Sequence, residues 1–286
     1  MNLGRWLTVA VIVAALATVG CGRSGGGSAT SPAAPAGTPG TAGASALGGG
    51  TLTVFAASSL TDAFNEIGAA FTRAHPGLDV RYNFGGSPTL RTQIEQGARA
   101  DVLAVADEAN MQAAFDKHLI ATAGTVFARN RLVIIAPKSN PKHISTAGDL
   151  AKPNLKLILA LPDVPAGRYA RDAIARIGED PAAEAGFAEK TLANVVSEEP
   201  NVKAIVTKIQ LDEGDAGVVY ATDVTAGVAT DLITIPIADA YNVSASYPIA
   251  VTTGASRPDG AQAFIDFVLA DEGQSILRKY GFLPPL

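Results

Sequence analysis

Small and hydroxyl-bearing residues stand at four places where a short apolar run gives way to a helix-like pattern. Each place is suited to an anion, because the first N–H groups of a helix lack an intrahelical acceptor and lie at the positive end of its dipole. Several such helix starts around one cavity would bind an anion without a cationic side chain. The four junctions are Ala57-Ser58-Ser59-Leu60, Gly85-Gly86-Ser87-Pro88, Val164-Pro165-Ala166-Gly167 and Pro200-Asn201-Val202-Lys203.

The local sequence predicts how each junction exposes its donors. The serine before the first helix is typical of an N-cap, and the glycines of the second junction permit close backbone approach to a ligand. Pro88 suits a first helical turn, and the small residues around Ala166 leave its N–H uncovered. Asn201 is the expected cap of the fourth helix, with the Val202 N–H among the free donors. Taken singly, each junction is also explained as a cap that only stabilises its helix.

Strands and helices alternate along the region that carries these junctions. The pattern begins at Thr51, and a second series opens around Arg131. Buried strands separated by helices predict an α/β protein with largely parallel sheets, whose ligands bind beyond the carboxyl ends of the strands. The expected strands are 52–55, 78–84, 101–106, 132–136, 155–161, 216–220 and 247–252, and the expected helices are 60–74, 89–96, 111–118, 168–177, 202–211 and 259–280, the last with a break near 271–273.

The N-terminal segment predicts export and a lipid anchor. Arg5, an apolar run and a small residue before Cys21 describe a secretory signal over residues 1–20, although an uncleaved anchor helix is the alternative. Cys21 stands where a bacterial lipoprotein carries its lipid, with Thr18 at a position where that motif usually has Leu. Because Cys21 is the one cysteine of the chain, it cannot form an intramolecular disulfide, and acylation would account for it.

Residues 21–50 follow as an expected flexible tether that starts at the lipidated cysteine. Gly, Ser, Ala, Thr and Pro dominate residues 22–50, and Arg23 is the one charged residue there. The formal net charge of the chain is -5, and removal of the signal with its one arginine makes it more negative still. With no Lys/Arg stripe to displace counterions, we expect no nucleic-acid partner.

Six runs stand in a fixed order along residues 51–286, namely TVFAASSLTDA at 53–63, FGGSPTL at 84–90, GARADV at 97–102, VPAGRYA at 164–170, GVVY at 217–220 and YGF at 280–282. Taken together and in this order, they resemble the molybdate-binding periplasmic proteins. The resemblance implies a type II periplasmic-binding-protein fold with lobe 1 at 51–131 plus 247–286 and lobe 2 at 132–246, joined by crossovers near Arg131 and Tyr247.

The resemblance also implies the ligands of the anion. Carried over position by position, it makes Ser59 and Ser87 ligands through their hydroxyl and backbone N–H groups. Ala166 and Val202 become ligands through backbone N–H groups, and Tyr220 through its hydroxyl. This set forms a neutral cage of donors.

Two departures from the family pattern concern the second and fourth junctions. Pro88 follows the second serine where relatives often carry another hydroxylic residue, and the run 198–201 is a looser approach to the fourth site than is usual in the family.

The implied function is capture of molybdate or tungstate and delivery to an ABC importer, whose permease would be the partner. The protein would act as a monomer, held at the outer face of the membrane by the lipid on Cys21, without a cofactor and without catalytic residues. Neutral donors can suffice because a buried dianion needs most of its acceptor sites filled. Sulfate is smaller and would stretch donors fixed for the larger ion, and the proton of phosphate would find no acceptor.

Other ligands and other classes of protein remain as alternatives. Sulfate, thiosulfate or another small anion would suit a similar cleft. An iron site would require clustered tyrosines with carboxylates, and Tyr220 is followed by Ala and Thr. A structural lipoprotein would show no response to any ligand.

An enzyme would require a nucleophile with a base, or a metal site. The three histidines, His75, His118 and His143, have no ligand spacing to one another or to Cys21, and are expected at the surface or at helix ends. Ser59 lies outside a G-x-S-x-G setting, so a hydrolase elbow is not indicated. Three tyrosines are expected in the core or between lobes rather than as ligands, namely Tyr169, Tyr241 and Tyr247.

Overall fold

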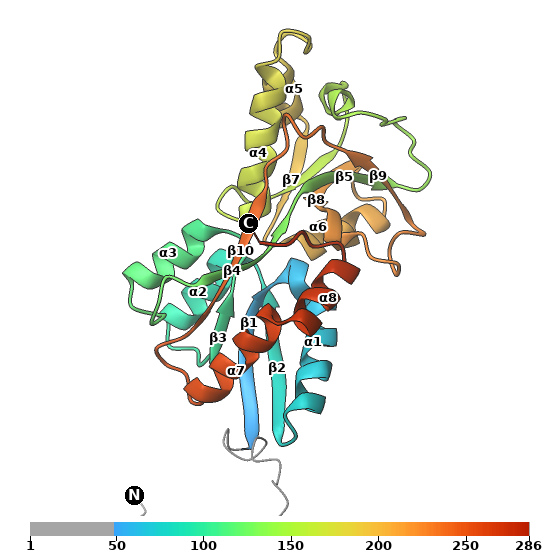
Figure 1. Cartoon of the computed structure of the whole chain (residues 1–286). Coiled ribbons are helices and arrows are strands. Elements are labelled where there is room, and N and C mark those ends of the chain that lie inside the picture. The colour runs from blue at the N-terminus through green and yellow to red at the C-terminus, as the bar shows by residue number, and fades with distance from the viewer. Residues whose placement is uncertain (1–48, 286) are drawn as a thin grey trace, which may run out of the picture. The chain divides into compact units, whose positions relative to one another are not determined.

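The computed structural model describes residues 49–285, which contain two five-stranded sheets flanked by helices (Figure 1). The expected signal segment 1–20, Cys21 and most of the expected tether lie outside the described residues. Within residues 49–285, no helix is long and apolar enough to cross a membrane.

The first sheet has the strand order β2-β1-β3-β10-β4. β1 runs parallel to β2 and β3, whereas β10 runs antiparallel to both β3 and β4. The elements of this part are β1 (Gly50–Ala57), η1 (Ser58–Leu60), α1 (Thr61–Ala74), β2 (Leu78–Gly85), α2 (Ser87–Glu95), β3 (Val102–Ala104), α3 (Glu108–Asp116), β4 (Thr125–Asn130), β10 (Ala245–Val251), α7 (Pro258–Leu269) and α8 (Asp271–Lys279).

The second sheet has the order β7-β6-β8-β5-β9, with β6 parallel to β7 and β8 and with β5 antiparallel to β8 and β9. The two sheets have the same arrangement. In the second sheet β7, β6, β8, β5 and β9 take the positions that β2, β1, β3, β10 and β4 take in the first. The elements of this part are β5 (Leu132–Pro137), η2 (Ala147–Ala151), β6 (Leu157–Ala160), α4 (Pro165–Gly178), α5 (Phe187–Ala193), β7 (Val195–Glu199), α6 (Val202–Gln210), β8 (Ala216–Tyr220), η3 (Ala221–Asp223) and β9 (Leu232–Pro236).

The chain passes twice between the sheets. It leaves β4 and enters β5 through Arg131, and it returns from β9 to β10 through residues 237–244. The strand reached by each passage is the antiparallel strand of its sheet. Asn242 links the two passages, because its Oδ1 accepts from the Leu132 N–H at 3.0 Å and its Nδ2 donates to the Leu132 carbonyl at 2.9 Å.

The predicted strands and helices are confirmed, apart from three details. Each sheet contains an antiparallel strand, so the sheets are less parallel than expected. The helical break lies at Ala270, just before the expected position. The strands β4, β7 and β9 and the helix α5 were not predicted from the pattern.

The core of the first part is built from aromatic side chains between the sheet and its helices. Phe264 of α7 packs edge-on against Phe64 and Phe71 of α1, with ring centroids 6.0 and 5.3 Å apart. Phe127 of β4 and Tyr247 of β10 extend this cluster toward the carboxyl end of β1, with centroids 6.3 Å apart. All five side chains are buried, so the cluster fixes the strand ends that carry the first two junctions.

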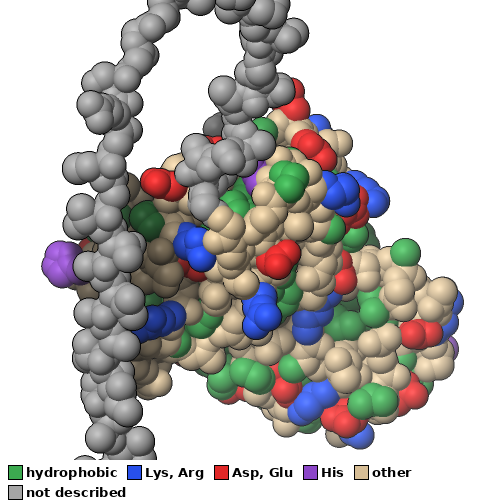
Figure 2. Space-filling model, turned by 90° about the horizontal axis from the view of Figure 1, so that it is seen from below, with side chains coloured by type: hydrophobic (Ala, Val, Ile, Leu, Met, Phe, Trp, Pro, Cys, Tyr) green, Lys and Arg blue, Asp and Glu red, His purple; other side chains and the backbone are tan. Residues whose placement is uncertain are grey.

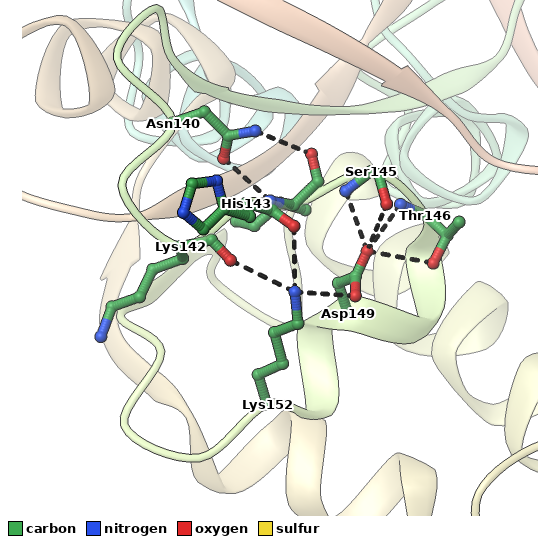
Figure 3. Close-up of polar contacts among 8 residues, drawn as sticks. Asn140, Lys142, His143, Ser145, Thr146, Asp149 and Lys152 are labelled. Carbon is green, nitrogen blue, oxygen red and sulfur yellow. Dashed lines mark hydrogen bonds and ion pairs between the residues drawn. The ribbon is translucent and has the colours of Figure 1, made fainter.

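The loop between β5 and β6 is held by Lys152 and Asp149 (Figure 3). Lys152 Nζ donates to the carbonyls of Lys142 and His143 at 3.2 and 2.9 Å and pairs with Asp149 at 2.9 Å. Asp149 also accepts from the Ser145 and Thr146 N–H groups, both at 2.8 Å. Although burial alone would raise the pKa of Asp149, these bonds hold it well below its usual range.

Charged side chains of both signs are mixed on one face of the molecule (Figure 2). Figure 2 shows one face of the molecule, on which Lys and Arg side chains are interspersed with Asp and Glu side chains. On the part of that face visible in Figure 2, a polyanion would meet repulsive as well as attractive groups.

Candidate functional site

One small cavity lies where strand ends of the two sheets meet. It is lined by all five residues assigned from the resemblance, and every residue of its lining is neutral. Its volume is about 10 Å³. Sites for drug-sized organic molecules have roughly 300–1,000 Å³, so the cavity suits a small ion rather than a metabolite. The five residues are Ser59, Ser87, Ala166, Val202 and Tyr220.

Three helices turn their first N–H groups toward this cavity. Ser87 is the first residue of α2, Val202 is the first of α6, and Ala166 is the second of α4. N–H groups in these positions have no intrahelical acceptor. Asn201 caps α6 through its Oδ1, which accepts from the Ala204 N–H at 3.1 Å, so the predicted cap is confirmed. Because that cap uses the third N–H of α6, the first remains available.

The expected serine N-cap at the first junction is wrong. Ser58, Ser59 and Leu60 form the single 3-10 turn η1, so the residue at the N-cap of α1 is Leu60, which makes no side-chain cap. The Ser58 carbonyl accepts from the Thr61 hydroxyl at 2.6 Å. The Ser59 hydroxyl contacts the Tyr247 hydroxyl at 2.9 Å. Its role is therefore not to stabilise α1, and it remains at the cavity wall.

The hydroxyl of Ser87 is oriented by the backbone. Its Oγ accepts from the Ala106 N–H at 3.1 Å, and an N–H group can only donate. The serine hydrogen is therefore free for another acceptor. Because Ser87 is buried at the cavity wall, an anion in the cavity is a suitable acceptor for it.

Tyr220, the last residue of β8, places a hydroxyl at the cavity without a hydrogen-bond partner in the described part of the chain. The side chain is buried, and burial raises its pKa well above the ordinary value, so the hydroxyl stays protonated. Buried polar groups in proteins are nearly always satisfied, so an unpartnered one at a cavity indicates a ligand. The Tyr220 N–H donates to Asp223 Oδ2 at 3.0 Å, and burial raises the pKa of Asp223 to about 7.

Two ion pairs beside the cavity connect the first part to helices of the second. Arg168 Nη2 of α4 lies 2.6 Å from Asp107 Oδ2, and Lys203 Nζ of α6 lies 2.8 Å from Asp62 Oδ2 of α1. Asp107 is fully buried and also caps α3, accepting from the Asn110 N–H at 2.9 Å. These pairs were not predicted as part of the site, because their partners lie far apart in the sequence.

The remaining candidates do not line the cavity. His75 ends α1, and His118 and His143 occupy turns with positive φ, as expected for surface or helix-end residues. In the described residues, no group of three or more His, Cys, Asp or Glu side chains could hold a metal ion. Tyr247 is buried in the core, as expected, and Tyr241 contacts Asp180 rather than the cavity.

Comparisons with known proteins find matches that extend over nearly the whole described region. Residues 52–283 match the family of bacterial extracellular solute-binding proteins. The molybdate-binding protein ModA of Mycobacterium tuberculosis is 38% identical over 285 residues, which cover 100% of this chain and 99% of that protein. ModA of Escherichia coli is 32% identical over 242 residues, covering 82% of this chain and 89% of that protein.

Solved structures show the same fold at lower identity. The periplasmic molybdate-binding protein of Azotobacter vinelandii aligns with a TM-score of 0.71 at 17% identity, covering 82% of this chain and 100% of that one. The expected architecture of paired α/β units is therefore confirmed, and the chain belongs to the family of bacterial extracellular solute-binding proteins.

Proposed function

We propose that this protein binds molybdate, or the similar tungstate, outside the cytoplasm and delivers it to the permease of an ABC importer. The observation that carries the proposal is the buried Tyr220 hydroxyl, unpartnered in the described residues, at a neutral cavity surrounded by helix N-termini. The extensive identity to proteins named for molybdate supports the choice of ion.

The chemistry of the lining suits a fully deprotonated tetrahedral oxyanion. Hydroxyl and N–H groups supply hydrogens, and no side chain of the lining carries a charge. A dianion removed from water then has its oxygens satisfied by donors, which offsets the cost of burying its charge. The site requires no catalytic group, and we propose binding without catalysis, a metal cofactor or a further cofactor.

We further propose that the two sheets and their helices are lobes that close on the ion. Lobe 1 would comprise 51–131 plus 247–286 and lobe 2 would comprise 132–246. Both lobes contribute donors, so an ion in the cavity stabilises the closed arrangement over an open one. We propose that the protein works as a monomer, because a single chain supplies the whole lining.

The ligand is tested by calorimetry and thermal unfolding of the purified protein with molybdate, tungstate, sulfate, thiosulfate and phosphate. We expect molybdate and tungstate to raise the melting temperature, since a ligand at about 1,000 times its Kd adds about 4 kcal/mol of stability. Equimolar sulfate is expected to have little effect. An equal shift with sulfate would favour the sulfate alternative, and no shift with any of these anions would contradict the proposed function.

We propose that a lipid on Cys21 holds the exported protein at the membrane surface. Cys21 lies outside the described residues, and the support is its position after the signal-like segment 1–20. Cys21→Ala is expected to move the protein from the membrane fraction to the soluble exported fraction, as measured by fractionation and immunoblotting. If Cys21→Ala protein stays with the membrane, the N-terminal apolar run itself is the anchor.

A further inference from the structure

A buried chain of side-chain hydrogen bonds leads from the first passage between the sheets to Ser59. Asn130 is the last residue of β4, and its Nδ2 lies 3.3 Å from the Tyr247 hydroxyl. The Tyr247 hydroxyl in turn lies 2.9 Å from Ser59 Oγ. Asn130, Tyr247 and Ser59 are 1%, 0% and 5% exposed, so water competes little for these bonds.

The orientation of the Asn130 amide is set by its neighbours. The Arg131 N–H can only donate, and it lies 2.9 Å from Asn130 Oδ1, which must therefore accept. The Nδ2 group then faces the other way, with one hydrogen for the Thr222 hydroxyl at 2.8 Å and one for the Tyr247 hydroxyl. Tyr247 consequently accepts from Asn130.

The direction of the last bond follows. In the described residues the Tyr247 hydroxyl contacts only Asn130 Nδ2, which cannot accept, and Ser59 Oγ. If Ser59 donated to Tyr247, the tyrosine hydrogen would be buried without an acceptor, which is costly. Tyr247 therefore donates to Ser59, and the hydrogen of Ser59 is left for the cavity that this residue lines.

We propose that Tyr247 and Asn130 are positioning residues for the anion: they orient the Ser59 hydroxyl so that it donates into the cavity. The proposal rests on the proposed function, because the acceptor is the bound oxyanion. The Ser87 hydroxyl is left free to donate without this chain of hydrogen bonds, since the Ala106 backbone N–H orients it directly. The two serines thus provide a matched comparison.

The chain of hydrogen bonds from Asn130 to Ser59 also depends on the arrangement of the two sheets. Asn130 immediately precedes the passage into β5, and Tyr247 lies in the strand that follows the return passage. Thr222, in η3 after β8, belongs to the second part and holds the other hydrogen of the Asn130 amide. The orientation of Ser59 is therefore linked to the contact between the parts.

The experiment is a pair of double-mutant cycles with the full chain, in which molybdate binding is measured by calorimetry. Tyr247→Phe keeps the buried ring and removes the hydroxyl, and we expect molybdate to bind about tenfold more weakly because the Ser59 hydroxyl loses its orientation. In a Ser59→Ala background the same substitution is expected to have no further effect. In a Ser87→Ala background its full tenfold effect is expected to remain.

Tyr241→Phe is the control, because it removes a tyrosine hydroxyl that contacts Asp180 away from the cavity. Variants that bind molybdate too weakly for calorimetry are compared by the shift of their melting temperature at saturating molybdate. An equal loss from Tyr247→Phe in the Ser59→Ala background, or no loss in the parent, would overturn the proposal and leave Tyr247 a packing residue. If the parent protein itself binds none of the oxyanions, it is the proposed function that fails.

Discussion

The Tyr220 hydroxyl is a buried polar group without a hydrogen-bond partner in the described part of the chain. Tyr220→Phe is therefore expected to leave the melting temperature of the free protein unchanged or slightly higher, since a buried group without a partner is removed. Molybdate should bind more weakly by about 1.5–3 kcal/mol, the range for a hydrogen bond to a charged group. Differential scanning calorimetry and titration calorimetry measure the two effects. A lower melting temperature with unchanged affinity would show that the hydroxyl serves the fold and not the anion.

At the scale of residues, the sequence predicted the groups that line the cavity but not the groups that orient them. Ser87 and Tyr220 occur in runs that resemble a family, so their positions could be carried over. The contact of Ser59 with Tyr247 joins residues 188 positions apart, and no local spacing reports such a pair. The serine cap was predicted wrongly because a 3-10 turn separates the strand from α1, and that turn has no distinctive local pattern.

At the scale of elements, substitutions at the first residue of α6 distinguish the role of its backbone N–H group from the role of its side chain. Val202→Ala keeps the N–H, whereas Val202→Pro removes it at the first helical position, where proline is tolerated. Both variants lose buried side-chain contacts, so Val202→Ala is the matched control. We expect Val202→Pro to bind molybdate about tenfold more weakly than Val202→Ala while circular dichroism shows both folded. Equal affinity in two folded variants would remove this helix start from the ligand set.

Place in the sheet separates most of the predicted strands from the missed ones, although the predicted strand β2 also lies at an edge. β6 and β8 are interior strands with continuous apolar runs, and the interior strand β1 ends in one, VFAA, so local reasoning recognises them. The missed strands β4, β7 and β9 all lie at sheet edges. An edge strand is paired on one side and carries more polar residues, as the sequence VVSEE of β7 illustrates. Its assignment depends on the neighbour that it pairs with, which the sequence alone does not identify.

At the scale of the whole molecule, the ion pair between Asp107 and Arg168 connects the two parts beside the cavity. In the arrangement seen here, Asp107 is fully buried and Arg168 is its cationic partner. A buried carboxylate that loses its partner is strongly unfavourable, but Arg168 remains 37% exposed, which reduces the effect. The pair therefore stabilises the arrangement that encloses the cavity, and an opened arrangement would let water solvate Asp107 instead.

Arg168→Met is accordingly expected to weaken molybdate binding about tenfold, because the closed arrangement alone contains the uncompensated carboxylate. The loss should appear as faster dissociation of molybdate in stopped-flow experiments, with a nearly unchanged association rate, since ions enter before closure. Lys190→Met is the control, because it removes an equal charge from an exposed pair with Glu184 that does not connect the two parts. An unchanged dissociation rate in Arg168→Met would show that the pair does not stabilise the ligand-holding arrangement, and closure would then depend on the contacts of the ion itself.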